Sequence, residues 1–168
     1  MNTERSWDAA VVEERPYCYC DTPVDLLRIT EDGHGICAVQ FADGADGPGP
    51  RGGTGVYLAQ AKSQLLEYFA GTRREFDLPL SVHGSAFQER VWNALQSIPY
   101  GETRSYQQVS QLIGSGKAAR AVGMANNRNP LPILIPCHRV VGKDGKLVGY
   151  AGGLERKRYL LDLEASSR

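Results

Sequence analysis

Three prolines within seven residues constrain the fold of this chain more than any other feature. They are Pro130, Pro132 and Pro136. Proline lacks an amide hydrogen and disfavours helical backbone in the residue before it, so a regular helix between Asn129 and Cys137 is excluded. We therefore expect the apolar run at 133–135 to be a buried extended segment that places Cys137 at its end.

The first half of the chain has the pattern of a small α/β domain. Apolar runs between Tyr17 and Phe41, interrupted by turn residues at 31–35, predict short strands. The Gly- and Pro-rich stretch at 42–55 is expected to be a flexible loop. Residues 56–71 have helical spacing, and their apolar face comprises Tyr57, Leu58, Ala61, Leu65, Leu66 and Phe69.

The second half is mainly helical in pattern. Two Ser-x-x-Gln sequences, at 85–88 and 105–108, are candidate capping boxes that begin helices. A short glycine-containing turn then leads to a third helix over 117–127, which completes the outline of a helix-turn-helix. A closing helix is expected over 152–165, with Leu154, Lys157, Arg158, Leu161 and Glu164 near one side.

These patterns predict an α+β chain of two domains. Residues 1–80 would form a small N-terminal α/β domain, a short antiparallel sheet plus a helix, with a supporting role. Residues 81–168 would form a mainly helical C-terminal domain with the helix-turn-helix. The charge divides in the same way. The first 80 residues carry 7 Lys and Arg against 13 Asp and Glu, and the rest carry 12 against 6, which favours a polyanionic partner for the C-terminal half.

The composition points to a cytoplasmic protein. No stretch approaches the ~20 apolar residues of a membrane span, and the polar N-terminus lacks the apolar core of a signal peptide. We therefore expect a reducing compartment, no membrane partner and a monomer in solution.

Four cysteines occur, and free thiols are the expected state in that compartment. Cys18 and Cys20 are two residues apart and would share one face of a strand. With His34 and Cys37 nearby, a zinc site is conceivable. The simpler interpretation, that these cysteines are small apolar residues of a sheet, is favoured. We expect no metal and no cofactor.

The third helix is almost free of bulky side chains. Ala118, Ala119, Ala121, Gly123 and Ala125 are small, and Arg120 is the long side chain among them. Small residues permit close packing of a helix on another helix. They equally suit a helix that enters a nucleic-acid groove, with Arg120 projecting into it. The basic charge of this half favours the interpretation that the helix enters a nucleic-acid groove.

Cys137 and His138 have the residue types of a nucleophile and its base. The thiolate is the reactive form of cysteine, and a neighbouring histidine can deprotonate it while a carboxylate orients the histidine. Adjacent side chains of an extended chain point to opposite faces, so a turn or a bridging water would have to connect the pair. Glu155, Asp162 and Glu164 are all candidates for the carboxylate. The simpler alternative is a packed cysteine beside a polar histidine.

Five sequence motifs together resemble one protein family. "SYQQV", "RAVG", "NP" eight residues before the cysteine, "IPCHRVV" and "YAGGL" occur in order between about Phe87 and Glu164. The chain in this region is similar to the O6-alkylguanine-DNA alkyltransferases, and "PCHRV" is highly specific. The N-terminal half resembles the family only loosely.

The resemblance implies repair of DNA by direct reversal. The alkyl group of O6-alkylguanine, and of O4-alkylthymine, would pass irreversibly to Cys137 in a single turnover. His138 would deprotonate the thiol through a water, and Glu164 would orient His138. Asn129 would brace the turn before the cysteine, and Tyr106 would crowd the target phosphate and hydrogen-bond the departing base.

The resemblance also implies that duplex DNA is bound through its minor groove. Arg120 would replace the flipped nucleotide in the base stack, which offsets part of the cost of extrusion. Further backbone contacts are expected from Gln107, Ser115 and Lys143. The guanine pocket is expected to be lined by Tyr150, Ala151 and Val140.

Three other functions fit parts of the pattern. A non-catalytic lesion sensor of the same fold would lack the reactive cysteine. A plain helix-turn-helix protein would not need "PCHRV". A cysteine hydrolase would turn over and would need an oxyanion hole.

Overall fold

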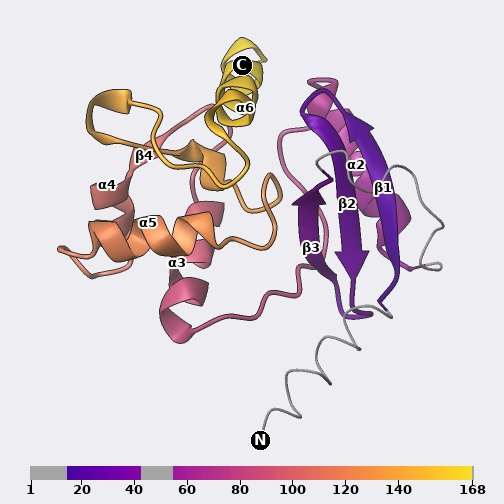
Figure 1. The fold of residues 1–168 in the computed structure, drawn as a ribbon, viewed down its shortest axis with the longest axis horizontal. Helices are drawn as coiled ribbons and strands as arrows, with labels where there is room; N and C mark the ends of the chain where they lie inside the picture. Colours follow the sequence, from indigo (N-terminus) through magenta and orange to yellow (C-terminus); the bar gives the residue numbers. More distant parts are fainter. Residues whose placement is uncertain (1–14, 43–54, 168) are drawn as a thin grey trace, which may run out of the picture. The chain divides into compact units, whose positions relative to one another are not determined.

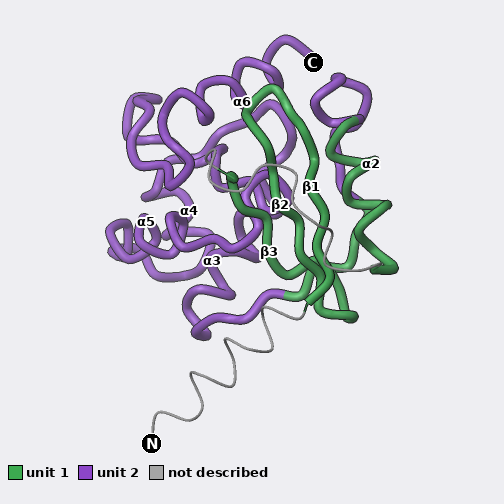
Figure 2. The backbone as a smooth tube through the Cα atoms, turned by 45° about the vertical axis from the view of Figure 1, so that its right-hand side comes forward, with its two compact units in different colours: residues 1–66, 77–81 green, residues 67–76, 82–168 purple. Residues whose placement is uncertain are grey.

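The computed structural model describes residues 15–42 and 55–167. Within them the chain forms two units (Figure 2). The first comprises 15–42, 55–66 and Asp77–Ser81, and the second comprises Glu67–Phe76 and 82–167. The expected flexible loop at 42–55 falls almost entirely outside the described residues.

The first unit is built on a three-stranded antiparallel sheet of order β1-β2-β3 (Figure 1). The strands are β1 (Tyr17–Thr22), β2 (Asp25–Glu31) and β3 (Ile36–Phe41). Cys20, Leu27, Ile29 and Val39 are buried, because alternate residues of each strand point to the same face. Cys18 lies opposite Ile29 and therefore on that face, as its spacing from Cys20 predicts.

Helix α2 (Leu58–Phe69) begins in the first unit, and its last three residues belong to the second. The Glu31 carboxylate accepts a hydrogen bond from the amide of Tyr57 at 2.7 Å, just before the helix begins. The expected apolar face is correct at Leu58, Ala61 and Leu65, which are buried. It is wrong at Leu66, which is 44% exposed, because Tyr68 takes the buried position instead.

Four helices and a two-stranded ladder form most of the second unit. The helices are α3 (Ala86–Gln96), α4 (Tyr106–Leu112), α5 (Ala119–Asn127) and α6 (Leu154–Ser166). The parallel strands β4 (Arg104–Ser105) and β5 (Val140–Val141) pair with each other. Since β4 leads directly into α4, this ladder places the start of α4 beside the residues that follow Cys137. The predicted α+β class, with a helical C-terminal part, is confirmed.

Both candidate capping boxes are present. The side chains of Ser85 and Ser105 accept the amides of Gln88 and Gln108, whose side chains accept the serine amides in return. The turn between α4 and α5 is held by the Ser110 hydroxyl, which donates to the Ser115 carbonyl and accepts the amide of Ala118 at 2.9 Å. The helix-turn-helix outline therefore follows from local side-chain chemistry.

The segment before Cys137 differs from the prediction. Residues 133–135 are buried, as expected, but they form a turn rather than an extended segment. Ile133 has φ +75°, which β-branched residues rarely adopt. Asn129 causes the turn, because its side chain accepts the amide of Leu131 and donates to the carbonyl of Ile135, each at 2.9 Å. The prolines excluded a helix, but they did not specify which non-helical conformation follows.

Cys137–Arg139 form a short 3-10 helix, η1. The expectation that Cys137 and His138 point to opposite faces of an extended chain is therefore wrong. Residues 143–145 form a second 3-10 turn, η2 (Lys143–Gly145), where Asp144 and Gly145 have positive φ. No helix among the described residues is long and apolar enough to cross a bilayer.

We predict that Ser105→Ala lowers the free energy of unfolding by about 1 kcal/mol, because the amide of Gln108 at the start of α4 loses its side-chain acceptor. Urea unfolding measures this change. The matched control is Gln111→Ala on the exposed side of α4, which should alter stability by less than about 0.5 kcal/mol. Equal losses in the two variants would contradict a capping role for Ser105.

Candidate active site

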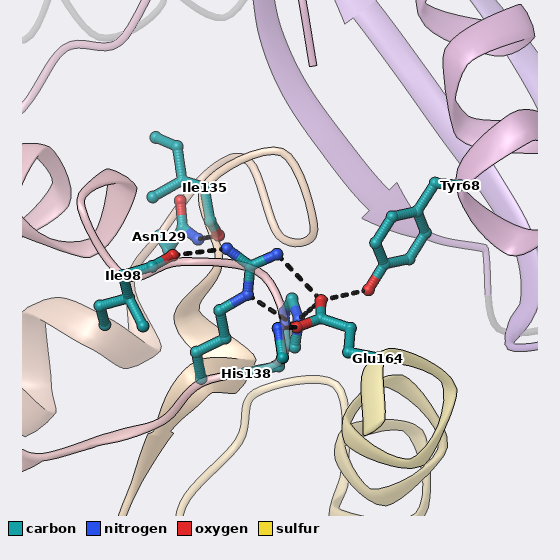
Figure 3. Close-up of polar contacts among 8 residues, drawn as sticks. Tyr68, Ile98, Asn129, Ile135, His138 and Glu164 are labelled. Carbon is teal, nitrogen blue, oxygen red and sulfur yellow. Dashed lines mark hydrogen bonds and ion pairs between the residues drawn. The ribbon is translucent and has the colours of Figure 1, made fainter. Parts of the chain in front are cut away.

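Cys137 lies at the start of η1 and is only 4% exposed. Its amide donates to the carbonyl of Ile135 at 2.7 Å, and its carbonyl accepts the side-chain amide of Asn126 at 3.3 Å. Figure 3 shows Asn129 beside Ile135 on the turn that leads to the cysteine. Asn126, in the last turn of α5, and Asn129, just after the helix, therefore fix the backbone at and before Cys137.

The thiol of Cys137 is protonated at rest. Burial raises its pKa, since a thiolate loses its hydration inside the protein. The side-chain amide of Asn129, the ammonium of Lys157 and the hydroxyl of Tyr150 oppose that effect. Formation of a thiolate at Cys137 would therefore require a base, and the surrounding polar groups would favour the thiolate once it formed.

His138 is the base that the geometry offers. It is fully buried, and its Nε2 lies 2.6 Å from Oε2 of Glu164. A carboxylate only accepts hydrogen bonds, so Nε2 carries the hydrogen and Nδ1 keeps a free lone pair. Nδ1 has no hydrogen-bond partner among the described residues. Burial lowers the pKa of His138, while Glu164 acts in the opposite direction, so the imidazole is neutral near pH 7.

The carboxylate of Glu164 accepts hydrogen bonds from four residues. Besides His138, Arg139 donates twice, from Nε to Oε1 at 2.8 Å and from Nη2 to Oε2 at 3.0 Å. The hydroxyl of Tyr68 donates to Oε2 at 2.6 Å, and the amide of Gly101 donates to Oε1 at 3.1 Å. Figure 3 shows Tyr68 and His138 converging on Glu164. These donors outweigh burial and hold the pKa of Glu164 well below its usual value.

Arg139 is itself fully engaged. Its Nη1 donates to the carbonyl of Ile98 at 2.7 Å, so the guanidinium links the end of α3 to Glu164 on α6. A buried guanidinium with a bidentate carboxylate is a strong and geometrically specific pair. Because both oxygens of Glu164 are occupied in this way, the carboxylate orients His138 without needing to accept its proton.

A second polar cluster lies around the carbonyls of residues 148 and 149. The Lys157 ammonium, wholly buried, donates to the carbonyls of Val140 at 2.6 Å, Val148 at 3.0 Å and Gly149 at 3.4 Å. The Tyr106 hydroxyl donates to the same Val148 and Gly149 carbonyls, at 3.0 and 3.3 Å. Burial lowers the pKa of Lys157 to about 8, and Cys137 opposes that shift. Burial raises the pKa of the phenols of Tyr106 and Tyr150, so both are donors.

The structure gathers the predicted chemical residues and leaves the predicted DNA contacts at the surface. Cys137, His138 and Glu164 are buried, and Asn129 supports the turn beside them. The remaining predicted residues are placed as follows. Arg120 and Gln107 are exposed on α5 and α4, Ser115 is half-buried in the turn between them, Lys143 is exposed on η2, Ala151 is exposed and Val140 is buried.

Four residues of the site were missed from the sequence. They are Tyr68, Asn126, Arg139 and Lys157. Arg139 had a usable signal, because an arginine inside the apolar run "IPCHRVV" must find a carboxylate if the run is buried. Lys157 lay on the predicted side of α6 together with Glu164, but so did Leu154, which is 47% exposed. Tyr68 gave no signal, because its partner is 96 residues away in the sequence.

Metal ligands do not gather in the part of the chain that the structure describes, where no group of three or more His, Cys, Asp or Glu side chains could hold a metal ion. The conceivable zinc ligands belong to β1, β3 and the turn between β2 and β3, where His34 is exposed. Burial raises the pKa of Cys20 to about 11 and also raises that of Cys37, as expected for unreactive thiols.

Comparison with known proteins identifies the family. The model of the 6-O-methylguanine DNA methyltransferase DNA-binding domain matches residues 86–166, and that of its ribonuclease-like domain matches residues 16–82. A methylated-DNA–protein-cysteine methyltransferase of Methanosarcina acetivorans is 45% identical over 89% of this chain and 98% of its own length. This chain belongs to the 6-O-methylguanine DNA methyltransferase family. The family resemblance expected from the sequence is confirmed.

Solved structures agree with this assignment. The crystal structure of the Mycobacterium tuberculosis O6-methylguanine methyltransferase is 44% identical, with a TM-score of 0.81 over 90% of this chain and 93% of that one. A structure of Mycobacterium tuberculosis OGT in complex with DNA is 42% identical, with a TM-score of 0.79 and the same coverage. The DNA-binding domain shared by this methyltransferase family covers the four helices of the second unit.

We predict that His138 makes this family member less stable in mild acid. In the unfolded chain, His138 takes up a proton at the usual histidine pKa of 6.5. In the native protein burial lowers the pKa of this imidazole, so it takes up a proton only at a lower pH. Stability should therefore fall as the pH decreases below that value, by up to about 1.4 kcal/mol per pH unit until the folded pKa is reached. Urea unfolding between pH 7.5 and 5, on the order of six points, measures the slope.

The variant His138→Gln should flatten this slope, because no imidazole then remains to take up a proton on unfolding. The matched control is Gln111→Ala, which changes an exposed residue with no titratable group and should keep the wild-type slope. Equal slopes in the wild type and His138→Gln would contradict the pKa direction assigned to His138.

Proposed function

We propose that this protein repairs DNA by transferring the alkyl group of O6-alkylguanine in duplex DNA to the sulfur of Cys137, once per molecule. The observation that carries the proposal is the buried set of Cys137, His138 and Glu164, in which Nδ1 of His138 accepts no hydrogen bond from the part of the chain that the structure describes. A structural role alone would not need a neutral, oriented imidazole next to a protonated thiol. O4-alkylthymine is included as a second substrate of the same chemistry.

The transfer is a displacement at the alkyl carbon. The thiol proton passes through a water to Nδ1 of His138, and the sulfur forms a bond to the alkyl carbon as the bond from that carbon to O6 breaks. The released electron pair stays on guanine, which then takes up a proton. Tyr106 can supply this proton, because its raised pKa keeps the phenol protonated, and the phenolate that remains takes up a proton from solvent. No step regenerates the thiol, so turnover ends after one transfer.

Tyr106 must release its present partners to perform this role. Its hydroxyl donates to the Val148 and Gly149 carbonyls, and Lys157 donates to the same two oxygens. When the phenol turns to a base, Lys157 still satisfies both carbonyls. The 148–149 backbone, which precedes Tyr150 of the proposed guanine pocket, can thus keep its conformation during the reaction.

The target base must leave the helix before the reaction, since its alkyl carbon lies inside the duplex. We assign α5 to the minor groove, where its small side chains fit and Arg120 is free to replace the extruded nucleotide. Gln107, Ser115 and Lys143 remain proposed backbone contacts, although Gln107 now donates to the carbonyl of Gly116. A cytoplasmic location would keep Cys137 reduced.

A lesion sensor of the same fold is the second candidate. It would bind DNA through the same helices but would need no cysteine to accept an alkyl group. The buried thiol with its oriented base favours the transferase.

We predict that incubation with duplex DNA containing O6-methylguanine adds one methyl group, about 14 Da, to the protein. Intact-mass measurement, followed by peptide mapping, should place the methyl group on Cys137. Cys137→Ser should gain no mass and should still bind the DNA. Cys20→Ser is the matched control, because that thiol is also buried and burial raises its pKa to about 11, and it should gain the methyl group as the wild type does.

Repeated turnover of substrate by one protein molecule would contradict a single-use acceptor. Binding of the damaged duplex without any mass gain would support the lesion sensor instead.

A further inference from the structure

The exposed side of α5 carries one large apolar residue. Arg120, Ala121 and Met124 are exposed, whereas Val122 and Ala125 are buried on the opposite side. Met124 is 63% exposed, whereas the exposed residue one turn before it towards the N-terminus, Ala121, is small. Met124 is the large apolar side chain on the exposed side of α5, which is unexpected if this side of the helix only faces water.

The orientation of this side is fixed by packing. A Cβ at Gly123 would lie 3.7 Å from the ring of Tyr106, so the helix contacts α4 there. Asn126 is buried and donates to the carbonyl of Cys137. Met124 lies between these two contacts in sequence but points away from them.

Met124 is flanked by two arginines at helical spacing. Arg120 precedes it by four residues, and Arg128, the exposed C-cap residue of α5, follows it by four. Residues four apart lie one above the other on a helix. Met124 thus stands in a row between two guanidinium groups. That row suits a polyanion with an apolar strip between its charges.

Duplex DNA has such a surface in its minor groove, where deoxyribose carbons line the walls between the two phosphate backbones. Four residues separate Met124 from Arg120, which is about 6 Å along the helix axis. That distance corresponds to between one and two base-pair steps of about 3.4 Å. The flexible thioether of methionine adapts to an irregular apolar surface.

We propose that Met124 is a DNA-contact residue that packs on the deoxyribose and base edges next to the nucleotide that Arg120 replaces. This inference rests on the proposed function, because it requires α5 to enter the minor groove. The contact contributes affinity that does not depend on counterion release. It therefore differs from a contact of Arg128 with phosphate, which neutralises backbone charge and releases counterions.

The test is the affinity of Met124→Ala for duplex DNA as a function of salt. Fluorescence anisotropy with an O6-methylguanine duplex should give a Kd about five- to tenfold weaker than wild type at every KCl concentration. The slope of log K against log salt should be unchanged, whereas Arg128→Ala should reduce it by about 1. Met124→Leu should restore the affinity. Leu112→Ala, which removes an exposed apolar residue of α4, is the matched control and should bind as the wild type does.

The reaction with free O6-benzylguanine separates binding from chemistry. Met124→Ala should react with it within about twofold of the wild-type rate, because the acceptor site is untouched. An unchanged Kd for DNA at all salt concentrations would overturn the proposal. An equal fold-loss in DNA affinity and in the rate with free O6-benzylguanine would also overturn it, because the substitution would then have disturbed the folded structure rather than a DNA contact. A change in sedimentation without a change in DNA affinity would assign the residue to a protein contact.

Failure of the proposed function has a different signature. In that case the wild type itself would not bind the duplex or gain the methyl group, and the variants could not differ from it.

Discussion

The buried carboxylate of Glu164 is the interaction on which the second unit depends. Taking a charged group out of water costs several kcal/mol unless its hydrogen bonds are replaced. Here the replacement comes from His138, Arg139, Tyr68 and the amide of Gly101. These donors belong to η1, to the end of α2 and to the turn after α3, so one carboxylate on α6 ties together segments that lie far apart in the sequence.

The same arrangement determines the chemistry. A carboxylate that receives a hydrogen bond from Nε2 leaves Nδ1 of His138 as the only ring nitrogen able to accept a proton. Burial lowers the pKa of His138, so the imidazole stays neutral, and hydrogen bonds from His138 and Arg139 lower the pKa of Glu164, so the carboxylate stays ionised. The thiol beside it is protonated at rest and is shielded from solvent. In the proposed function, this thiol would react only when an alkylated DNA base enters the site, which suits an acceptor that can be used only once.

Much of this architecture could be predicted from the sequence where local chemistry decides it. The capping boxes at Ser85 and Ser105, the strands of the sheet and the helix-turn-helix each follow from a few adjacent residues. The triplet of Cys137, His138 and Glu164 was reached through the family motifs. From residue types alone, Glu155 and Asp162 were equally good partners for His138.

The remaining features depend on contacts distant in sequence. The turn at 133–135 was predicted as extended because the prolines only exclude helix, and the side chain of Asn129 decides the alternative. Tyr68 approaches Glu164 only after the chain has folded, and its spacing on α2 gave no reason to prefer it over Leu66. The pairing of Arg139 with Glu164 could be predicted only with the knowledge that the segment "IPCHRVV" is buried.

The central claim is that Glu164 holds His138 as a neutral imidazole with its hydrogen on Nε2. The most direct measurement is the ¹⁵N chemical shift of both ring nitrogens of His138, followed by NMR from pH 8 to about 5. The account predicts a protonated Nε2, an unprotonated Nδ1 and a titration midpoint below 6.5, the usual histidine value. A hydrogen on Nδ1, or a midpoint at or above the usual value, would contradict it.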